Sequence, residues 1–188
     1  MHTEQNPWKI LNEEVVYDNP WIKVIHHNVI NPSGNEGIYG QVHFKNKAIG
    51  VVAVDEEGYT FLVGQYRFPT KSYSWEIPEG GCPYEEEPLT AAKRELEEET
   101  GLVAEHWKLI SNAHLSNSVS DEYGYIFLAT GLTQQHAMPE ETEQLLVKKV
   151  ALKEAFKMVE DGMITDSLSV IGLQKVELLL VKGDLKLA

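Results

Sequence analysis

The sequence predicts a mixed α/β sandwich. Two observations carry this prediction: apolar, strand-like runs occur before, between and after the segments with helical periodicity, and these runs do not alternate regularly with helices as they do in parallel α/β folds. With 188 residues, 43% of them hydrophobic, the chain can form an ordinary globular core in one domain, or in one domain with an added piece.

The added piece is expected at the N-terminus. Residues 21–44 read WIKVIHHNVI, NPSGNEG and IYGQVHF, which is typical of two strands around a turn rich in Asn, Pro and Gly. We therefore expect a small N-terminal sheet within residues 1–44, followed by a second domain over residues 45–188.

A second hairpin is expected to build the central sheet. Its strands are AIGVVAV, residues 48–54, and YTFLVGQYRF, residues 59–68, joined by DEEG. Because the first strand is almost continuously apolar, we expect it to be buried on both faces. After the short WEIP segment, strands are expected near residues 107–110, 123–129 and 145–150, and helices near residues 153–160 and 166–180.

Composition excludes several classes of function. A formal charge of −13 and a pI near 4.9 argue against binding to nucleic acid or to an anionic membrane, since both need a basic surface. An anionic small substrate would need a metal ion or local arginines. The single cysteine, Cys82, excludes an intramolecular disulfide and a Cys-rich zinc site. No basic start precedes an apolar run, and no run approaches the roughly 18 apolar residues of a membrane span, so we expect a cytoplasmic protein.

The stretch GGCPYEEEPLTAAKRELEEETGL, residues 80–102, predicts a helix from about Pro88 to Thr100. Proline suits the first turn, where its missing N–H costs nothing, and Gly101 can take the left-handed conformation that ends a helix. At 100° per residue, one apolar stripe is expected to pack on the sheet. This stripe consists of Leu89, Ala92 and Leu96.

Glutamates crowd the same predicted helix. Glu95, Glu98 and Glu99 fall at i, i+3 and i+4, so their carboxylates converge on one face, whereas Glu97 points elsewhere. Oxygen ligands on one side of a rigid helix suit Mg²⁺ or Mn²⁺, whose binding would relieve the repulsion between the carboxylates. On spacing alone, a solvated acidic surface is the competing interpretation.

The surroundings of these glutamates favour the metal site. Gly80, five intervening residues, Glu86, seven more and then RELEEETGL, residues 94–102, resemble the signature of the Nudix hydrolases at every fixed position. The resemblance implies a Nudix α/β/α sandwich with a mixed central sheet and an added small antiparallel N-terminal sheet. It also implies hydrolysis of a nucleoside diphosphate linked to another moiety, with Mg²⁺ or Mn²⁺ as cofactor.

Carried over residue by residue, the resemblance assigns roles around the helix. The side chains of Glu95, Glu98 and Glu99 are implied metal ligands, Glu98 is also counted as catalytic, and the carbonyl of Glu79 is an additional ligand. Supporting roles fall to an ion pair that orients the helix and to glycines at the two tight loops. These supporting residues are Glu86 with Arg94, and Gly80 with Gly101.

Outside the signature, the chain resembles the branch that hydrolyses ADP-ribose and other nucleoside diphosphate sugars. The matching segments are DNPWIKV, GQYRFP, WEIPEGG, SDEYGYIFLATGL and VEDGMITDSLSVIGLQ. This branch implies a homodimer formed through the N-terminal sheet, with Trp21 or Trp8 stacking on a base. Arg67 is implied to contact the phosphate or the distal sugar, and Glu76 and Glu122 to make polar contacts with the substrate.

In this branch the catalytic base comes from the loop before the strand LLVKKV. Glu141 and Glu143, in PEETEQ, are the candidates, with Glu140 a third acid nearby. One departure concerns the substrate: where ADP-ribose hydrolases usually carry Pro-Gly, this chain has SNSVSDE with Asn117. A broader nucleoside diphosphate sugar preference, or a GDP-mannose-type specificity, therefore stays open beside ADP-ribose, as does a nucleotide-sugar-sensing domain without turnover.

Overall fold

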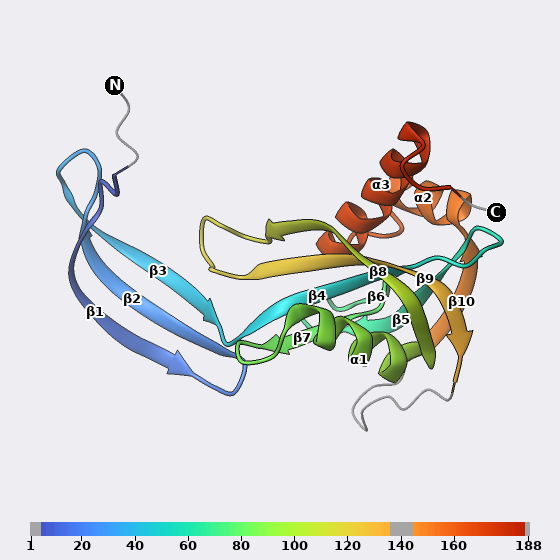
Figure 1. Ribbon diagram of the computed structural model, residues 1–188. Coiled ribbons are helices and arrows are strands. Elements are labelled where there is room, and N and C mark those ends of the chain that lie inside the picture. Colours follow the sequence, from blue (N-terminus) through green and yellow to red (C-terminus); the bar gives the residue numbers. More distant parts are fainter. Residues whose placement is uncertain (1–4, 136–144, 187–188) are drawn as a thin grey trace. The chain divides into compact units, whose positions relative to one another are not determined.

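A computed structural model describes residues 5–135 and 145–186 (Figure 1). The chain divides into two compact units, the first comprising residues 1–46 and 114–122 and the second residues 47–113 and 123–188. The described strands are β1 (Lys9–Asp18), β2 (Ile22–Ile30), β3 (Glu36–Phe44), β4 (Asn46–Ala53), β5 (Tyr59–Arg67), β6 (Ser72–Glu76), β7 (Glu79–Pro83), β8 (Leu102–His114), β9 (Tyr123–Gln134) and β10 (Leu146–Ala151). The described helices are α1 (Pro88–Thr100), α2 (Leu152–Glu160) and α3 (Ser167–Lys182).

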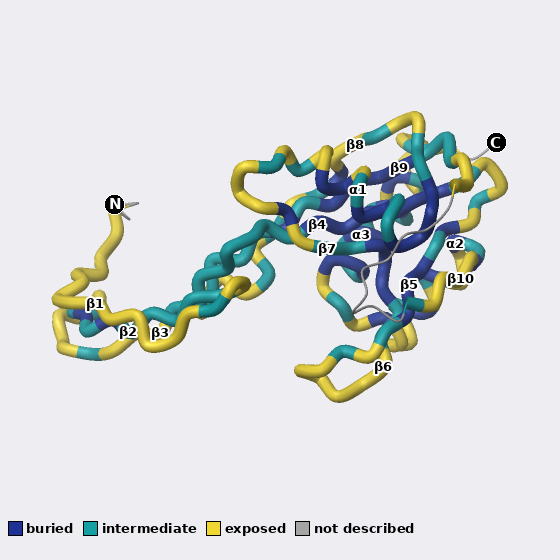
Figure 2. The backbone as a smooth tube through the Cα atoms, turned by 90° about the horizontal axis from the view of Figure 1, so that it is seen from below, coloured by how far each residue is buried: buried dark blue, intermediate teal, exposed yellow. Residues whose placement is uncertain are grey.

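The first unit is an antiparallel sheet in the order β1-β2-β3. The expected strands β2 and β3 are present, and β1 joins them as a third strand that the sequence reading missed. The sequence of β1, KILNEEVVYD, lacks the strict alternation of apolar and polar residues that predicts a half-buried strand. In the structure all residues of β1 are exposed (Figure 2).

Residues 115–122 are held against β3 by hydrogen bonds within the first unit. The peptide N–H of Val42 donates to the carbonyl of Val119 over 2.8 Å, and the N–H of Asp121 donates back to Val42 over 3.2 Å. Asp121 Oδ2 lies 2.5 Å from His43 Nδ1, and burial, which alone would raise its pKa, is outweighed by the hydrogen bond from His43, so the pKa of Asp121 is lowered. This segment therefore belongs to the same unit as the N-terminal sheet, although it lies between β8 and β9 in sequence.

The second unit contains two sheets, in the orders β7-β4-β9-β8 and β10-β5-β6. β4 and β9 are parallel, with Gly50 opposite Ile126, whereas β5 is antiparallel to both β10 and β6. Parallel and antiparallel pairs together with flanking helices confirm the mixed α/β prediction.

The expected hairpin between β4 and β5 is wrong. The two strands are joined antiparallel only at an isolated bridge between Val54 and Thr60, and then continue in different sheets. The physical reason is that both edges of β4 are already hydrogen-bonded, to β7 and β9, while β10 and β6 occupy both edges of β5. β4 and β5 therefore pair with other strands and not with each other beyond that bridge.

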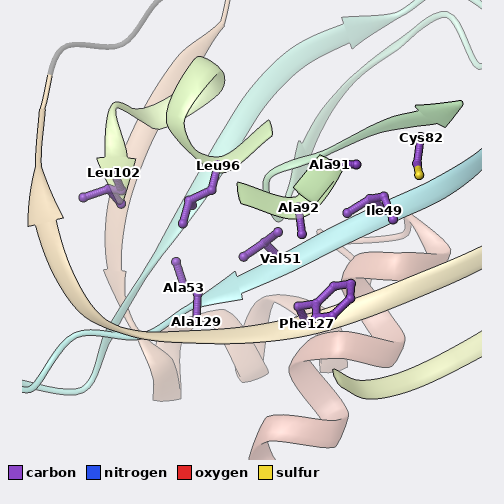
Figure 3. Close-up of a cluster of buried hydrophobic side chains, with 10 residues drawn as sticks. All are labelled: Ile49, Val51, Ala53, Cys82, Ala91, Ala92, Leu96, Leu102, Phe127 and Ala129. Carbon is purple, nitrogen blue, oxygen red and sulfur yellow. The ribbon is translucent and has the colours of Figure 1, made fainter. Parts of the chain in front are cut away.

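β4 is buried on both faces, as its apolar sequence predicts. One face packs under α1, where Ala92 and Leu96 lie against Val51 (Figure 3). The other face meets α3, because a Cβ built on Gly172 would lie only 2.9 Å from Val52 and 3.1 Å from Ile126. Helices therefore cover both sides of the strand.

No helix in the two described ranges is long and apolar enough to cross a membrane.

α1 has the predicted bounds. It ends at Thr100 and is capped by Gly101, whose φ of 70° lies in the left-handed region and whose N–H donates to the carbonyl of Glu97. The predicted apolar stripe is correct for Ala92 and Leu96, which are fully buried, but wrong for Leu89, which is exposed. Leu89 lies in the first turn, whereas Ala91, one position before Ala92, takes part in the buried cluster instead.

α3 connects the helical layer to the strand that precedes the signature. Its N-cap residue, Asp166, accepts a hydrogen bond from the N–H of Ser169 through Oδ2 over 2.8 Å. The hydroxyl of Ser169, fully buried, in turn accepts from the N–H of Ile77 over 2.9 Å. The start of α3 is therefore fixed beside the segment between β6 and β7.

Candidate active site

The predicted metal-binding glutamates lie on the last two turns of α1. Glu95 and Glu99 are buried and Glu98 is partly exposed, although glutamate rarely occupies buried positions without a specific partner. Glu95 faces Gly80 at such short range that a Cβ on Gly80 would overlap the carboxylate. The missing side chain of Gly80 thus makes the space in which Glu95 lies.

Arg94 compensates the charge of this face. Its Nη1 donates to Glu95 over 2.7 Å and to Glu98 over 3.0 Å, while its Nη2 donates to the carbonyl of Gly81 and lies 3.2 Å from Glu86. The ion pair between Arg94 and Glu86 that the resemblance implies is therefore present, as part of a larger network. Burial lowers the pKa of Arg94, but the bonds to these carboxylates outweigh it and raise the pKa.

Glu99 is oriented by the strand before the helix. Its Oε2 accepts a hydrogen bond from the peptide N–H of Glu79 over 2.9 Å. A backbone donor holds a carboxylate more rigidly than a side chain would, because the peptide is fixed at the start of β7. Glu79 and Glu99, two of the four residues expected at the metal, are therefore in direct contact.

The side chain of Glu79 points to a second set of charged residues. Arg67 Nη2 donates to Glu79 Oε1 over 2.7 Å and to Glu76 Oε2 over 2.5 Å, and Arg67 Nε donates to both oxygens of Glu76 at 3.0 Å. Glu76 is almost fully buried. Arg67 and Glu76, predicted separately as substrate contacts, thus form one bidentate pair.

Asp166 completes this second set, and the sequence reading missed its role. Carboxylate oxygens of Glu76, Glu79 and Asp166 all lie within 4.8 Å of one another. Burial raises the pKa of Glu79 well above its usual range, and the charges of Asp166 and Glu76 raise it further against the opposing effect of Arg67. The sequence ITDSLSV predicts Asp166 as a helix N-cap, but no local pattern reveals that it approaches Glu79.

Lys47 is a further residue near the signature that the sequence did not indicate. Its Nζ donates to the carbonyl of Glu86 over 3.0 Å and lies 5.9 Å from the centre of the Tyr84 ring. Glu86, in the loop between β7 and α1, is therefore held twice: Lys47 binds its carbonyl and Arg94 binds its side chain.

The remaining predicted residues belong to the first unit or fall outside the described residues. Trp21 and Glu122 belong to the first unit, Trp21 being highly exposed and Trp8 packing edge-on against Tyr39. The candidate bases Glu141 and Glu143, and Glu140, lie outside the described residues.

The α1 face fits a hard divalent cation. It presents carboxylate oxygens from Glu95, Glu98 and Glu99, the donor type that Mg²⁺ and Mn²⁺ prefer. Glu95 and Glu98 already share one cationic donor, Arg94 Nη1, so their oxygens lie close enough to serve a common positive charge. An ion bound there would share these two carboxylates with Arg94.

The fold and this glutamate face define the class of protein, and the family models agree. The NUDIX domain model matches residues 44–166, and the model of the nucleoside diphosphate sugar hydrolase N-terminal domain matches residues 8–42. Because the first match spans well over half of the chain, the chain belongs to the Nudix family.

The chain is also similar to individual proteins of known name. The chain is 35% identical over 133 residues to an ADP-ribose pyrophosphatase of Bacillus subtilis (strain 168), covering 70% of this chain and 72% of that protein. It is 30% identical over 172 residues to a methanol dehydrogenase activator of Bacillus methanolicus, covering 90% and 92%. A crystal structure of an ADP compounds hydrolase superposes with a TM-score of 0.85 over 98% of this chain and all of that one; at 22% identity this shows the shared fold.

Proposed function

We propose that this protein hydrolyses the diphosphate bond of a nucleoside diphosphate sugar, ADP-ribose or a related compound, to a nucleoside monophosphate and a sugar phosphate. The observation that carries the proposal is the set of three glutamates on α1: Arg94 binds Glu95 and Glu98, and the Glu79 N–H binds Glu99. The match of residues 8–42 to the N-terminal domain of nucleoside diphosphate sugar hydrolases supports the substrate class.

The chemistry requires positive charge at the diphosphate. A divalent cation, Mg²⁺ or Mn²⁺, would neutralise phosphate oxygens and lower the pKa of the attacking water. The protein supplies the binding surface: Glu95, Glu98 and the Glu79 carbonyl are proposed ligands together with Glu99, whose carboxylate is held by the Glu79 N–H. Since the chain carries a formal charge of −13, an anionic substrate depends on such local compensation.

A substrate panel tests this function. ADP-ribose, ADP-glucose, GDP-mannose, UDP-glucose and dinucleoside polyphosphates are incubated with Mg²⁺ or Mn²⁺ in ¹⁸O-water, and the products are identified by mass. Turnover of one or more sugar nucleotides to a monophosphate and a sugar phosphate is expected. Binding without turnover of any of them would favour the sensing domain, whereas preferred cleavage of GDP-mannose would establish the alternative specificity.

The catalytic base is proposed to be Glu141 or Glu143. Replacing the correct one with glutamine removes the proton acceptor, so kcat should fall by about a hundredfold or more with a nearly unchanged KM. Each single variant is assayed on the best substrate of the panel, with Glu140→Gln as the neighbouring control. If neither variant slows hydrolysis, neither Glu141 nor Glu143 is the base.

A homodimer through the N-terminal sheet is the proposed assembly. β1 is exposed along its whole length, and Ile10, Val15 and Tyr17 each have at least half of their surface accessible. A sheet of three strands needs an apolar face covered to be stable, and large exposed apolar patches mark interaction sites. Light scattering should therefore give a mass near twice 21.2 kDa, and a mass near 21.2 kDa at micromolar concentration would contradict the dimer.

The proposed location of the enzyme is the cytoplasm.

A further inference from the structure

Glu86, the partner of Arg94 beside the proposed metal ligands, is held at each of its polar groups. Its peptide N–H donates to the carbonyl of Pro83 over 3.0 Å, and its carboxylate accepts a hydrogen bond from Arg94 over 3.2 Å. Its carbonyl accepts two hydrogen bonds, from Lys47 Nζ over 3.0 Å and from Cys82 Sγ over 3.4 Å. The place of the Glu86 carboxylate is therefore set by a backbone that Lys47 and Cys82 fix.

The two donors to this carbonyl differ in strength. Cys82 is fully buried in the cluster under α1 (Figure 3), and burial raises the pKa of its thiol, so the S–H stays protonated and donates weakly. Lys47 brings a full positive charge from β4, and a hydrogen bond from a charged donor is roughly twice as strong as one between neutral groups. Lys47 is therefore the stronger of the two anchors.

The Glu86 carboxylate matters because it holds one side of the Arg94 guanidinium. Arg94 Nη2 donates to this carboxylate and, over 2.9 Å, to the carbonyl of Gly81. Arg94 Nη1 donates to Glu95 over 2.7 Å and to Glu98 over 3.0 Å. Since the guanidinium is planar and rigid, fixing Nη2 also fixes the direction in which Nη1 points. A shift of Glu86 would therefore change how Arg94 meets the glutamates of α1.

We propose that Lys47 is a positioning residue of the metal site and acts through Glu86, which orients Arg94 toward the glutamates of α1. This rests on the proposed function, because it takes those glutamates as ligands of a divalent cation. It adds to the signature a residue from outside it, since Lys47 belongs to β4. Lys47 itself touches neither the cation nor the substrate.

Electrostatics alone predicts the opposite effect. If the charge of Lys47 acted only by repelling a cation at α1, removing that charge would strengthen cation binding. Positioning predicts weaker binding, because the ligands lose their fixed arrangement. Loss of a residue that directly supports a metal ligand typically costs about 10-fold to 100-fold in affinity, and Lys47 lies further from the ligands, so we expect a loss of about fivefold or more.

Calorimetric titration with Mn²⁺ measures the direction of the effect. Lys47→Met should raise the Kd for Mn²⁺ at least about fivefold, whereas Lys47→Arg keeps a charged donor and should stay within about twofold. Lys157→Met is the control, because it removes the same charge from α2, where Lys157 pairs with Asp161, and should leave the Kd unchanged. Unchanged or tighter Mn²⁺ binding by a folded Lys47→Met protein would overturn the proposal. If a thermal melt shows that Lys47→Met is unfolded at the assay temperature, Lys47→Gln replaces it with the same expectation.

A double-mutant cycle tests whether Lys47 acts through Glu86. Glu86→Ala removes the carboxylate that orients Arg94 but leaves the backbone carbonyl that Lys47 binds. Adding Lys47→Met to Glu86→Ala should therefore change the Kd for Mn²⁺ by no more than about twofold. A full additional loss of about fivefold would show that Lys47 acts by another route and would contradict the proposal. Because the titration needs no turnover, a failed substrate panel would sink the proposed function and leave this result standing, whereas an unchanged protein that binds no Mn²⁺ would sink both.

Discussion

Replacing Glu99 with glutamine is expected to lower kcat by at least about a hundredfold while leaving the fold intact. The amide retains a carbonyl oxygen that can accept the hydrogen bond from the Glu79 N–H, so the packing of this buried side chain is preserved. What is lost is the negative charge that a divalent cation requires. The measurement is kcat over a Mg²⁺ titration on the best substrate, together with a thermal melt.

Glu97→Gln is the matched control for this experiment. Glu97 lies on the same helix, and its backbone carbonyl, which the substitution does not change, accepts the closing bond from Gly101. Its activity should stay within about twofold of the original protein. Near-normal activity of Glu99→Gln at every Mg²⁺ concentration would remove Glu99 from the metal site.

The second large effect is expected from Gly80→Ala. The new Cβ would overlap the carboxylate of Glu95, and since this is the far end of a flexible side chain, Glu95 should move while the backbone stays in place. Displacing one proposed ligand should weaken Mn²⁺ binding by about tenfold or more and lower kcat/KM by about a hundredfold. Calorimetric titration with Mn²⁺ measures the first effect without any need for turnover.

Gly40→Ala is the control for adding a methyl group at a strand glycine. Apart from its two chain neighbours, no described residue has an atom within 4 Å of a Cβ on Gly40, and this glycine has no positive φ. Unchanged Mn²⁺ affinity in both variants would mean that Glu95 does not need the space beside Gly80 to bind metal.

The parts of this molecule that could be predicted are those fixed by local chemistry. α1 has its predicted bounds because Pro88 and Gly101 determine its ends through their own backbone preferences, whatever the rest of the chain does. The positions of the glutamates along α1 follow from helical geometry. Even within α1, the choice between Leu89 and Ala91 for the buried face depended on where the sheet lies.

What could not be predicted depends on contacts distant in sequence. The pairing of β4 with β9 rather than with β5 is decided by competition among whole strands, which no local pattern records. Likewise, Glu76 and Arg67 each looked like an independent substrate contact, and only the fold shows that they are bound to each other and share their surroundings with Asp166.

The grouping of residues 114–122 with the N-terminal sheet makes the protein inseparable into two independent modules. The chain passes from one unit to the other three times, after residues 46, 113 and 122, so no single cut yields both units whole. A fragment beginning at residue 47 would leave Val119 and Asp121 without their hydrogen-bond partner Val42, and Asp121 without His43. A deletion or a domain exchange that separates residues 114–122 from the N-terminal strands would therefore remove these contacts.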